Sequence, residues 1–356
     1  MATQQAGWQR ELQDILIRHN EQHAHRSKVV SHRTRTARAQ ALFRCFRLLH
    51  AMGFHVRPAG LGGRHVEWLM RYWTADAAVP EKLAATGAKV AARAAPYSAA
   101  YIQQQLSHVR VFGAWIGKPG LVLPAGHYVA DAGLVVRSYS ARSDHSWCGQ
   151  AVDAHSIVRR VAALDDHVAV QLHVMLAFGL RRKEAVMFNP RRAEVPAHAL
   201  PCGHQHTGPY LAFLRVRRGT KGGRLRYVAV RTSFQRDALE LAGRFVLHED
   251  GHIGRPGLSL KQSLDRFSNV LRSVGISRRS LGVTPHGLRH QFAADLYFDL
   301  AAVQPPVRGG DPATDSETLR HAYLEVARQL GHGRPQISNA YLGAPPRAKP
   351  SQNDPS

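Results

Sequence analysis

Six residues, widely separated in the chain, have side chains that can act on a phosphate diester. A tyrosine hydroxyl can attack phosphorus and store the bond energy covalently, and guanidinium groups match phosphate oxygens with paired hydrogen bonds. Taken one at a time, each residue also has an ordinary structural explanation, such as a solvated helix end, a turn lysine or a packed tyrosine. The six residues are Arg181, Lys221, His286, Arg289, His332 and Tyr341.

As a group, these residues could exchange phosphodiester bonds without ATP. The phenol of Tyr341 has an ordinary pKa of about 10, so it must lose its proton as it attacks. The pentavalent state carries extra negative charge on its non-bridging oxygens, and Arg181 with Arg289 could hold those oxygens. Glu184 lies three residues after Arg181, where it could orient the cationic site or form an ordinary surface pair.

The hydrophobic pattern predicts the elements that must position these residues. Periodic apolar positions indicate helices over residues 165–177, 260–274, 289–300 and 314–330. The last helix has a possible capping box from Thr314 to Glu317 and a glycine stop at Gly331. Two alternating segments, residues 210–217 and 224–231, flank the glycine-rich turn around Lys221 and predict a β-hairpin.

With 356 residues, the chain is long enough for two domains, because single cores rarely exceed about 250–300 residues. Periodic apolar positions after Ala37 and over residues 98–116, with Ser98 as a helix cap, predict a helical N-terminal domain. We therefore expect an α-dominated α+β fold with a mixed C-terminal domain that holds a small β-sheet. The predicted parts are a basic flexible arm (1–35), the helical domain (36–120), a linker (121–150), the mixed domain (151–344) and a polar tail (345–356).

Composition favours a polyanionic partner. The chain has 48 Lys and Arg against 25 Asp and Glu, a formal charge of +23, which favours nucleic acid. The alternative explanations of this charge are an arginine-rich proteome, a ribosome-like protein or a protein that binds a membrane surface.

The odd number of scattered cysteines argues against a disulfide framework. The first residues lack the apolar core of a signal peptide, and no stretch reaches the roughly 20 apolar residues of a membrane span. We expect a cytoplasmic protein without a membrane partner.

Taken together and in this order, the six residues resemble the tyrosine recombinase (phage integrase) family. The resemblance covers about residues 150–345, and covers residues 36–120 only as a helical domain in the expected place. The interval from His332 to Tyr341 is also the usual one in the family. The matching stretches are Ala177-Phe178-Gly179-Leu180-Arg181-Arg182-Lys183-Glu184, Thr220-Lys221-Gly222, His286-Gly287-Leu288-Arg289-His290 and Leu330-Gly331-His332 through Tyr341.

The resemblance implies roles for the remaining residues and for the domains. Lys221 would protonate the departing 5′ oxygen, His286 would accept or orient the tyrosine proton, and His332 would donate to a phosphate oxygen. Residues 36–120 would be a core-binding DNA-binding domain, and residues 151–344 a catalytic recombinase domain. Nothing in this set calls for a metal or another cofactor.

The implied activity is that of a site-specific recombinase or integrase, whose task could be integration of a mobile element, excision, or resolution of chromosome dimers. Such a protein cleaves and rejoins double-stranded DNA through a 3′-phosphotyrosyl intermediate, as a homotetramer assembled on its recombination sites. The cell type implied is bacterial or phage-infected, with the protein at the nucleoid when it is bound to DNA.

Several alternatives stay open at this level. They are a type IB topoisomerase that relaxes supercoils, a DNA-binding regulator without catalysis, and a metal-dependent nuclease. A separate cluster, Cys202-Gly203-His204-Gln205-His206 with His198 nearby, offers soft metal ligands but lacks a second pair at zinc-finger spacing.

Two features depart from the family pattern. The Pro/Gly-rich residues 303–313 are longer than in compact members and indicate a surface insertion. The tail after Tyr341 has little apolar surface to pass to a neighbouring subunit.

Overall fold

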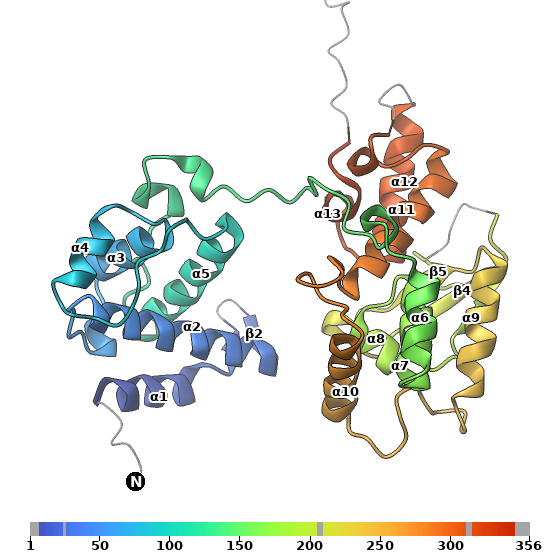
Figure 1. Ribbon diagram of the computed structural model, residues 1–356, viewed down its shortest axis with the longest axis horizontal. Helices are drawn as coiled ribbons and strands as arrows, with labels where there is room; N and C mark the ends of the chain where they lie inside the picture. Colours follow the sequence, from blue (N-terminus) through green and yellow to red (C-terminus); the bar gives the residue numbers. More distant parts are fainter. Residues whose placement is uncertain (1–6, 24–25, 205–208, 311–314, 346–356) are drawn as a thin grey trace, which may run out of the picture. The chain divides into compact units, whose positions relative to one another are not determined.

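The computed structural model describes residues 7–23, 26–204, 209–310 and 315–345. The chain divides into two compact units, Met1–Arg137 and Ser138–Ser356 (Figure 1). This division falls inside the segment 121–150 that was predicted to be a linker. The roles assigned to the two units remain predictions.

The N-terminal unit is helical. Its apolar core is formed mainly by α2, α3 and α5, whose inward faces carry leucine, phenylalanine and tryptophan side chains. Ser31 caps α2 by accepting a hydrogen bond from Thr34 N, and Ser98 caps α5 in the same way through Tyr101 N. The elements are α1 (Gly7–His19), β1 (Gln22–His23), β2 (Arg26–Val29), α2 (His32–Ala51), α3 (Gly63–Trp73), α4 (Ala78–Ala84) and α5 (Ala99–Trp115).

The expectation of a flexible arm over residues 1–35 is wrong for the described part of that segment. Leu12, Ile15 and Leu16 of α1 are buried in the same core as α2, and the indole of Trp8 stacks on Phe46 at 5.9 Å between ring centroids. The apolar residues recur at helical spacing, so they form one buried face although polar residues dominate the segment.

The C-terminal unit combines helices with one three-stranded sheet. Helices were predicted over 165–177, 260–274 and 289–300, and all three are present as α7, α10 and α11. The helices are α6 (Ala154–Ala162), α7 (Asp166–Phe178), α8 (Arg182–Val186), α9 (Ser233–Arg244), α10 (Leu260–Ser273), α11 (His286–Ala301), α12 (Ser316–Gln329) and α13 (Asn339–Leu342). The strands are β3 (Glu194–Pro196), β4 (Ala212–Val216) and β5 (Arg226–Ala229).

Helix α7 is the centre of this unit. It is apolar on nearly every side and packs against α6, α8, α9 and α11, as expected of a fully enclosed helix. Gly179 ends α7 with φ +59°, and a Cβ at this position would lie 2.5 Å from the ring of Phe292. A glycine is therefore required where the chain turns from α7 toward Arg181.

The predicted hairpin is present as β4 and β5, in an antiparallel sheet of order β3-β4-β5. Leu214 pairs with Val228 and Phe213 with Ala229. The strands are shorter than predicted, and the turn between them contains a short helical segment at Lys221–Gly223. Both strands belong to the C-terminal unit, where Figure 1 labels them.

Two local expectations need correction. The N-cap of α12 is Asp315, which accepts a hydrogen bond from Thr318 N, whereas the predicted cap Thr314 lies outside the described residues. Residues 138–150 belong to the folded C-terminal unit and not to a free linker, because Trp147 is fully buried in its core.

The predicted fold class is confirmed by these elements: a mostly helical chain with a small antiparallel sheet in its C-terminal unit. Within the described ranges, none of the helices has both the length and the apolar character needed to cross a bilayer.

Candidate active site

Arg289 joins the separate segments of the site. It lies in the first turn of α11 and is fully buried. Its guanidinium donates to the carbonyl oxygens of Gly179 and Leu330, each at 2.5 Å, and its Nε donates to the hydroxyl of Tyr341 at 3.2 Å. His332 Nε2 lies 3.4 Å from Arg289 Nη2. One side chain thus connects the end of α7, the end of α12 and the helix α13 that carries the tyrosine.

Arg181 lies beside Arg289. Its Nη2 reaches the same Leu330 carbonyl at 3.5 Å, so the two guanidiniums converge on one point. The Arg181 side chain is 28% exposed, whereas Arg289 is enclosed. The pair therefore offers one cation at the surface and one beneath it, and guanidinium groups form strong paired hydrogen bonds with phosphate oxygens.

Glu184 holds the Arg181 side chain in place through hydrogen bonds and an ion pair. Its side chain is completely buried and accepts from the backbone N of Arg181 at 2.7 Å and from Arg181 Nη1 at 2.8 Å. Arg226 of β5 adds a bidentate pair to the same carboxylate, with both bonds at 2.8 Å. Burial alone would raise the pKa of Glu184, but Arg226, Arg289 and Arg181 outweigh it and lower the pKa to about 2. The carboxylate is ionised at any physiological pH.

Tyr341 is held at the site by its surroundings. It is 7% exposed, and its ring lies 5.9 Å from that of His286 and 5.6 Å from that of His332. A Cβ at Gly331 would lie 2.8 Å from Arg226 Cδ, so a glycine is needed where the chain passes Arg226 just before His332. The structure therefore brings Arg181, Glu184, His286, Arg289, His332 and Tyr341 together.

Lys221 is the predicted residue that is not brought into this cluster. It lies exposed in the turn between β4 and β5, and in the described part of the chain no bond links it to the other site residues. Gly222 and Gly223, both at positive φ, follow it directly. Because glycine has no side chain, these two neighbours cannot hold Lys221 in one position through side-chain contacts.

Two residues of the site were not singled out from the sequence. Arg226 is one of 48 basic residues, and no motif distinguishes it from the others. His290, within the quoted stretch after Arg289, packs its ring 4.7 Å from that of Tyr341. The Nδ1 of His290 is buried and has no hydrogen-bond partner among the described residues.

The imidazoles around Tyr341 are uncharged at neutral pH. Burial first, and then the neighbouring Arg289 and Arg181, lower the pKa of His286 to about 4 and that of His332 to about 3. Burial, with His286 and His145 nearby, lowers the pKa of His290 to about 3. A neutral imidazole has one nitrogen that can accept a proton, so His286 is chemically able to receive the phenolic proton.

These shifts predict that acid destabilises the protein well above the range of carboxylate titration. Unfolded histidines take up protons near pH 6.5, whereas these three stay neutral when folded until about pH 4 to 3. The unfolded state therefore binds more protons below pH 6.5. The buried His290 should lower the free energy of unfolding by about 1 kcal/mol between pH 7.5 and 5.5, and the more exposed His286 and His332 should contribute less, because solvent screens their surroundings. Urea unfolding at the two pH values measures the loss, and His290→Gln should reduce it. Equal stability at both values would contradict the neutral cluster.

A basic cavity of about 380 Å³ opens beside His332. Its lining joins the β5 side of the hairpin to the end of α12, and it includes three arginines, Arg224, Arg226 and Arg328. Positive charge in a concave surface attracts phosphate. The site therefore opens onto a surface that suits a polyanion.

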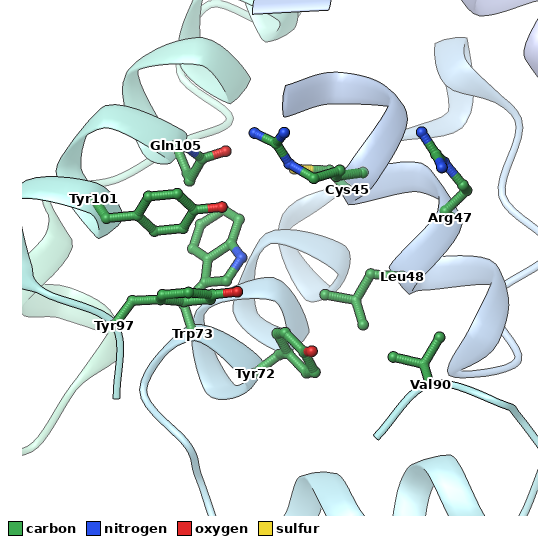
Figure 2. A pocket seen from close by; sticks show the side chains of 10 residues that line it. Cys45, Arg47, Leu48, Tyr72, Trp73, Val90, Tyr97, Tyr101 and Gln105 are labelled. Atoms are coloured by element: carbon green, nitrogen blue, oxygen red, sulfur yellow. The ribbon is translucent and has the colours of Figure 1, made fainter. Parts of the chain in front are cut away.

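A second pocket, of about 280 Å³, lies within the N-terminal unit. Tyr97 and Tyr101 point their hydroxyls into it, with Trp73 behind them and Arg47 on the opposite side (Figure 2). Arg44 also lines the pocket, one turn from Arg47 on α2, and both side chains are exposed. The pocket combines aromatic rings with two cations.

No group of three or more potential metal ligands is present among the described residues. His206, one member of the cysteine–histidine cluster considered above, falls outside them.

Comparison with known proteins identifies one matching family. Residues 140–295 match the family model described as integrase. This range contains Arg181, Lys221, His286 and Arg289, and it ends before His332 and Tyr341. No curated protein matches the sequence of the chain.

Two solved structures align with most of the chain at low identity. One is the XerH site-specific recombinase bound to palindromic difH substrate in a post-cleavage complex, with 12% identity, 86% of this chain and 74% of that chain covered, and a TM-score of 0.45. The other is a lambda integrase dimer bound to a COC′ core site, with 14% identity, 93% and 94% covered, and a TM-score of 0.49.

Proposed function

We propose that the chain is a tyrosine recombinase of the integrase type, and that it exchanges DNA strands through a covalent bond between Tyr341 and phosphorus. The observation that carries the proposal is the position of Arg289. It donates to the Tyr341 hydroxyl and lies beside Arg181 at the Leu330 carbonyl. A nucleophile is thus already placed next to two cations that can hold the phosphate it attacks.

In the proposed cleavage step, Arg181 and Arg289 donate to the non-bridging oxygens of the scissile phosphate. Charge that develops on these oxygens meets fixed cations, and such electrostatic stabilisation is usually the largest contribution to catalysis. Glu184 keeps Arg181 and Arg226 oriented through its four hydrogen bonds. His332, next to Arg289 Nη2, donates to one phosphate oxygen.

Cleavage transfers one phosphoryl bond and one proton at each end of the reacting group. The Tyr341 oxygen forms a bond to phosphorus as the bond to the 5′ oxygen breaks, and the phenolic proton passes to His286. Lys221, at the exposed hairpin turn, closes on the bound DNA and protonates the departing 5′ oxygen. The products are a 3′-phosphotyrosyl link and a free 5′ hydroxyl. A 5′ hydroxyl of a partner duplex reverses the step and joins the exchanged strands.

The decisive experiment is covalent trapping. Nicked duplexes of randomised sequence lose the short 5′-hydroxyl fragment after cleavage, so that the protein remains attached to DNA. Recovery of protein-linked DNA then also identifies the preferred site. We expect an adduct on the 3′-phosphate side, formed equally well in EDTA. Attachment at a 5′ phosphate, or loss of the adduct in EDTA, would contradict the proposal.

We further propose that the N-terminal unit contributes phosphate contacts through Arg44 and Arg47 on α2. Each phosphate contact releases counterions and steepens the salt dependence of binding by about one unit of log–log slope. The double variant Arg44→Ala/Arg47→Ala should therefore reduce the slope of log Kd against log salt by about two. Arg244→Ala, which removes an exposed arginine of an i,i+4 pair on α9, is the matched control. An unchanged slope in the double variant would exclude these contacts.

The remaining parts of the proposal concern assembly and setting. Exchange between two duplexes requires four protomers, so we propose a homotetramer on DNA, which sedimentation with the trapped site can measure. A monomer that relaxes plasmids without partner sites would instead be a topoisomerase. We propose that the protein works in the cytoplasm of a bacterial or phage-infected cell, consistent with the free state of Cys45, Cys148 and Cys202.

A further inference from the structure

We propose that Arg308 is a positioning residue for DNA cleavage, acting through the segment Ala141 to Cys148. We name this segment the clamp. Arg308 lies in the Pro/Gly-rich insertion, at the end of the short helical turn Pro306–Arg308, and the proposed function gives it no task. The inference rests on that proposed function, because what the clamp positions is the residues of the cleavage site.

Arg308 ties three clamp residues together. Its Nε donates to Asp144 Oδ2 at 2.7 Å, and its Nη2 donates to Ser146 Oγ at 2.9 Å and to Cys148 Sγ at 3.0 Å. The ion pair is largely shielded, since the side chains of Arg308 and Asp144 are 18% and 12% exposed. Burial opposes ionisation of Asp144, but bonds from Ser146 and Arg308 outweigh it and lower its pKa. The pair is therefore charged whenever the enzyme works.

The other side of the clamp is attached to α11, which carries His286 and Arg289. Trp147 is fully buried and donates from its indole to the carbonyl of Thr284 at 2.7 Å. Cys148 N donates to the side chain of Gln291 at 3.3 Å. The His145 carbonyl approaches Gly287 so closely that a Cβ there would lie 2.6 Å from it. The clamp thus encloses the first turn of the catalytic helix.

The clamp and the insertion also contact the residues on either side of Tyr341. Ala141 N donates to the carbonyl of Asn339 at 2.8 Å, in the short helix α13 two residues before Tyr341. From the insertion, Val307 N and Pro306 lie against Gly343, where a Cβ would be 3.0 Å from Val307 N. Helix α13 has only four residues, so it depends on such neighbours for its position.

Loss of Arg308 therefore frees both helices that must meet at the phosphate. Attack by a phenol requires near-contact geometry, and a displacement of about 1 Å can reduce the rate about 100-fold. DNA affinity depends on many contacts over a wide surface, so it should change little. The expected signature is a fall in the cleavage rate at constant affinity.

The test uses the whole chain and the nicked duplex described above, on which the protein remains covalently attached after cleavage. Single-turnover adduct formation and the Kd for the duplex are measured for Arg308→Ala, Arg308→Gln and Arg308→Lys, with Arg244→Ala as control. We expect Arg308→Ala to slow the adduct by about 10- to 100-fold with Kd within twofold, and Arg308→Lys, which keeps the charge, to recover part of the rate. Because Asp144 and Arg308 form one ion pair, their effects should not add. The double variant Asp144→Ala/Arg308→Ala should form the adduct at a rate within about threefold of the slower single variant.

A second measurement does not depend on activity. Amide hydrogen exchange on the protein without DNA should be faster over residues 339–343 and 286–291 in Arg308→Ala than in wild type, and unchanged in Arg244→Ala. Wild-type adduct rates in Arg308→Ala, or unaltered exchange over these segments, would overturn the inference. So would equal losses of rate and affinity accompanied by a lower unfolding midpoint, the pattern of a general structural role. Absence of an adduct with wild-type protein would instead overturn the proposed function, whatever the exchange shows.

Discussion

Replacing Tyr341 by phenylalanine should abolish the covalent protein–DNA adduct, a loss of at least about 1,000-fold, and leave DNA affinity within about twofold. The substitution removes only the hydroxyl that accepts from Arg289 Nε. The ring keeps its contacts with His286, His290 and His332, so the fold of the site should be retained. Without a nucleophile the covalent route is closed, because nothing else supplies the bond to phosphorus.

The measurement is gel separation of protein-linked from free DNA on the nicked duplex, together with fluorescence anisotropy for affinity. Tyr323→Phe is the matched control, since Tyr323 is also buried and its hydroxyl donates to the Gly343 carbonyl at 2.9 Å, outside the cluster. An adduct that persists in Tyr341→Phe would assign the nucleophile to another residue.

Replacing Glu184 by alanine should destabilise the C-terminal unit by about 3–5 kcal/mol. Glu184 and Arg226 are enclosed, with side-chain exposures of 0% and 2%, so removal of the carboxylate leaves a buried guanidinium without its counter-charge. Breaking a buried ion pair from one side costs that much, whereas replacing both partners by apolar groups costs far less. Glu184→Leu/Arg226→Met should therefore be more stable than Glu184→Ala, although it should cleave DNA poorly.

Urea unfolding of the purified variants at pH 7.5 gives these free energies. Glu240→Ala provides the matched control, since Glu240 and Arg244 are both 70% exposed and such pairs contribute at most about 1 kcal/mol. If Glu184→Ala unfolds at the wild-type urea concentration, the carboxylate does not organise the buried cations.

The sequence predicted most of the site because its residues lie beside strong local signals. Arg181 and Glu184 follow an apolar helix and its glycine stop, and Arg289 and Tyr341 belong to motifs with definite spacing. Arg226 could not be predicted, since its role depends on how β5 meets α8, a contact between residues 42 positions apart. Lys221 shows the converse, because the resemblance predicts a role for it while the structure places it in an exposed turn.

The fold was predictable to a similar extent and for similar reasons. Long helices with a clear apolar face, such as α5 and α10, were found, and the hairpin followed from its alternation and glycine-rich turn. The segment after Ser138 lacked any periodicity and was taken for a linker. Its order comes from single tertiary contacts, such as the indole of Trp147 at Thr284, which leave no local pattern in a sequence.

The balance of charge around Glu184 has a further consequence. Three guanidiniums, those of Arg181, Arg226 and Arg289, act on this one carboxylate, so the four side chains together carry two positive charges that Glu184 does not compensate. Their mutual repulsion is an electrostatic strain that the fold sustains until a phosphate arrives, and an anion that binds only the folded state stabilises that state in proportion to its occupancy. An anion bound between these arginines should therefore raise the free energy of unfolding of the C-terminal unit.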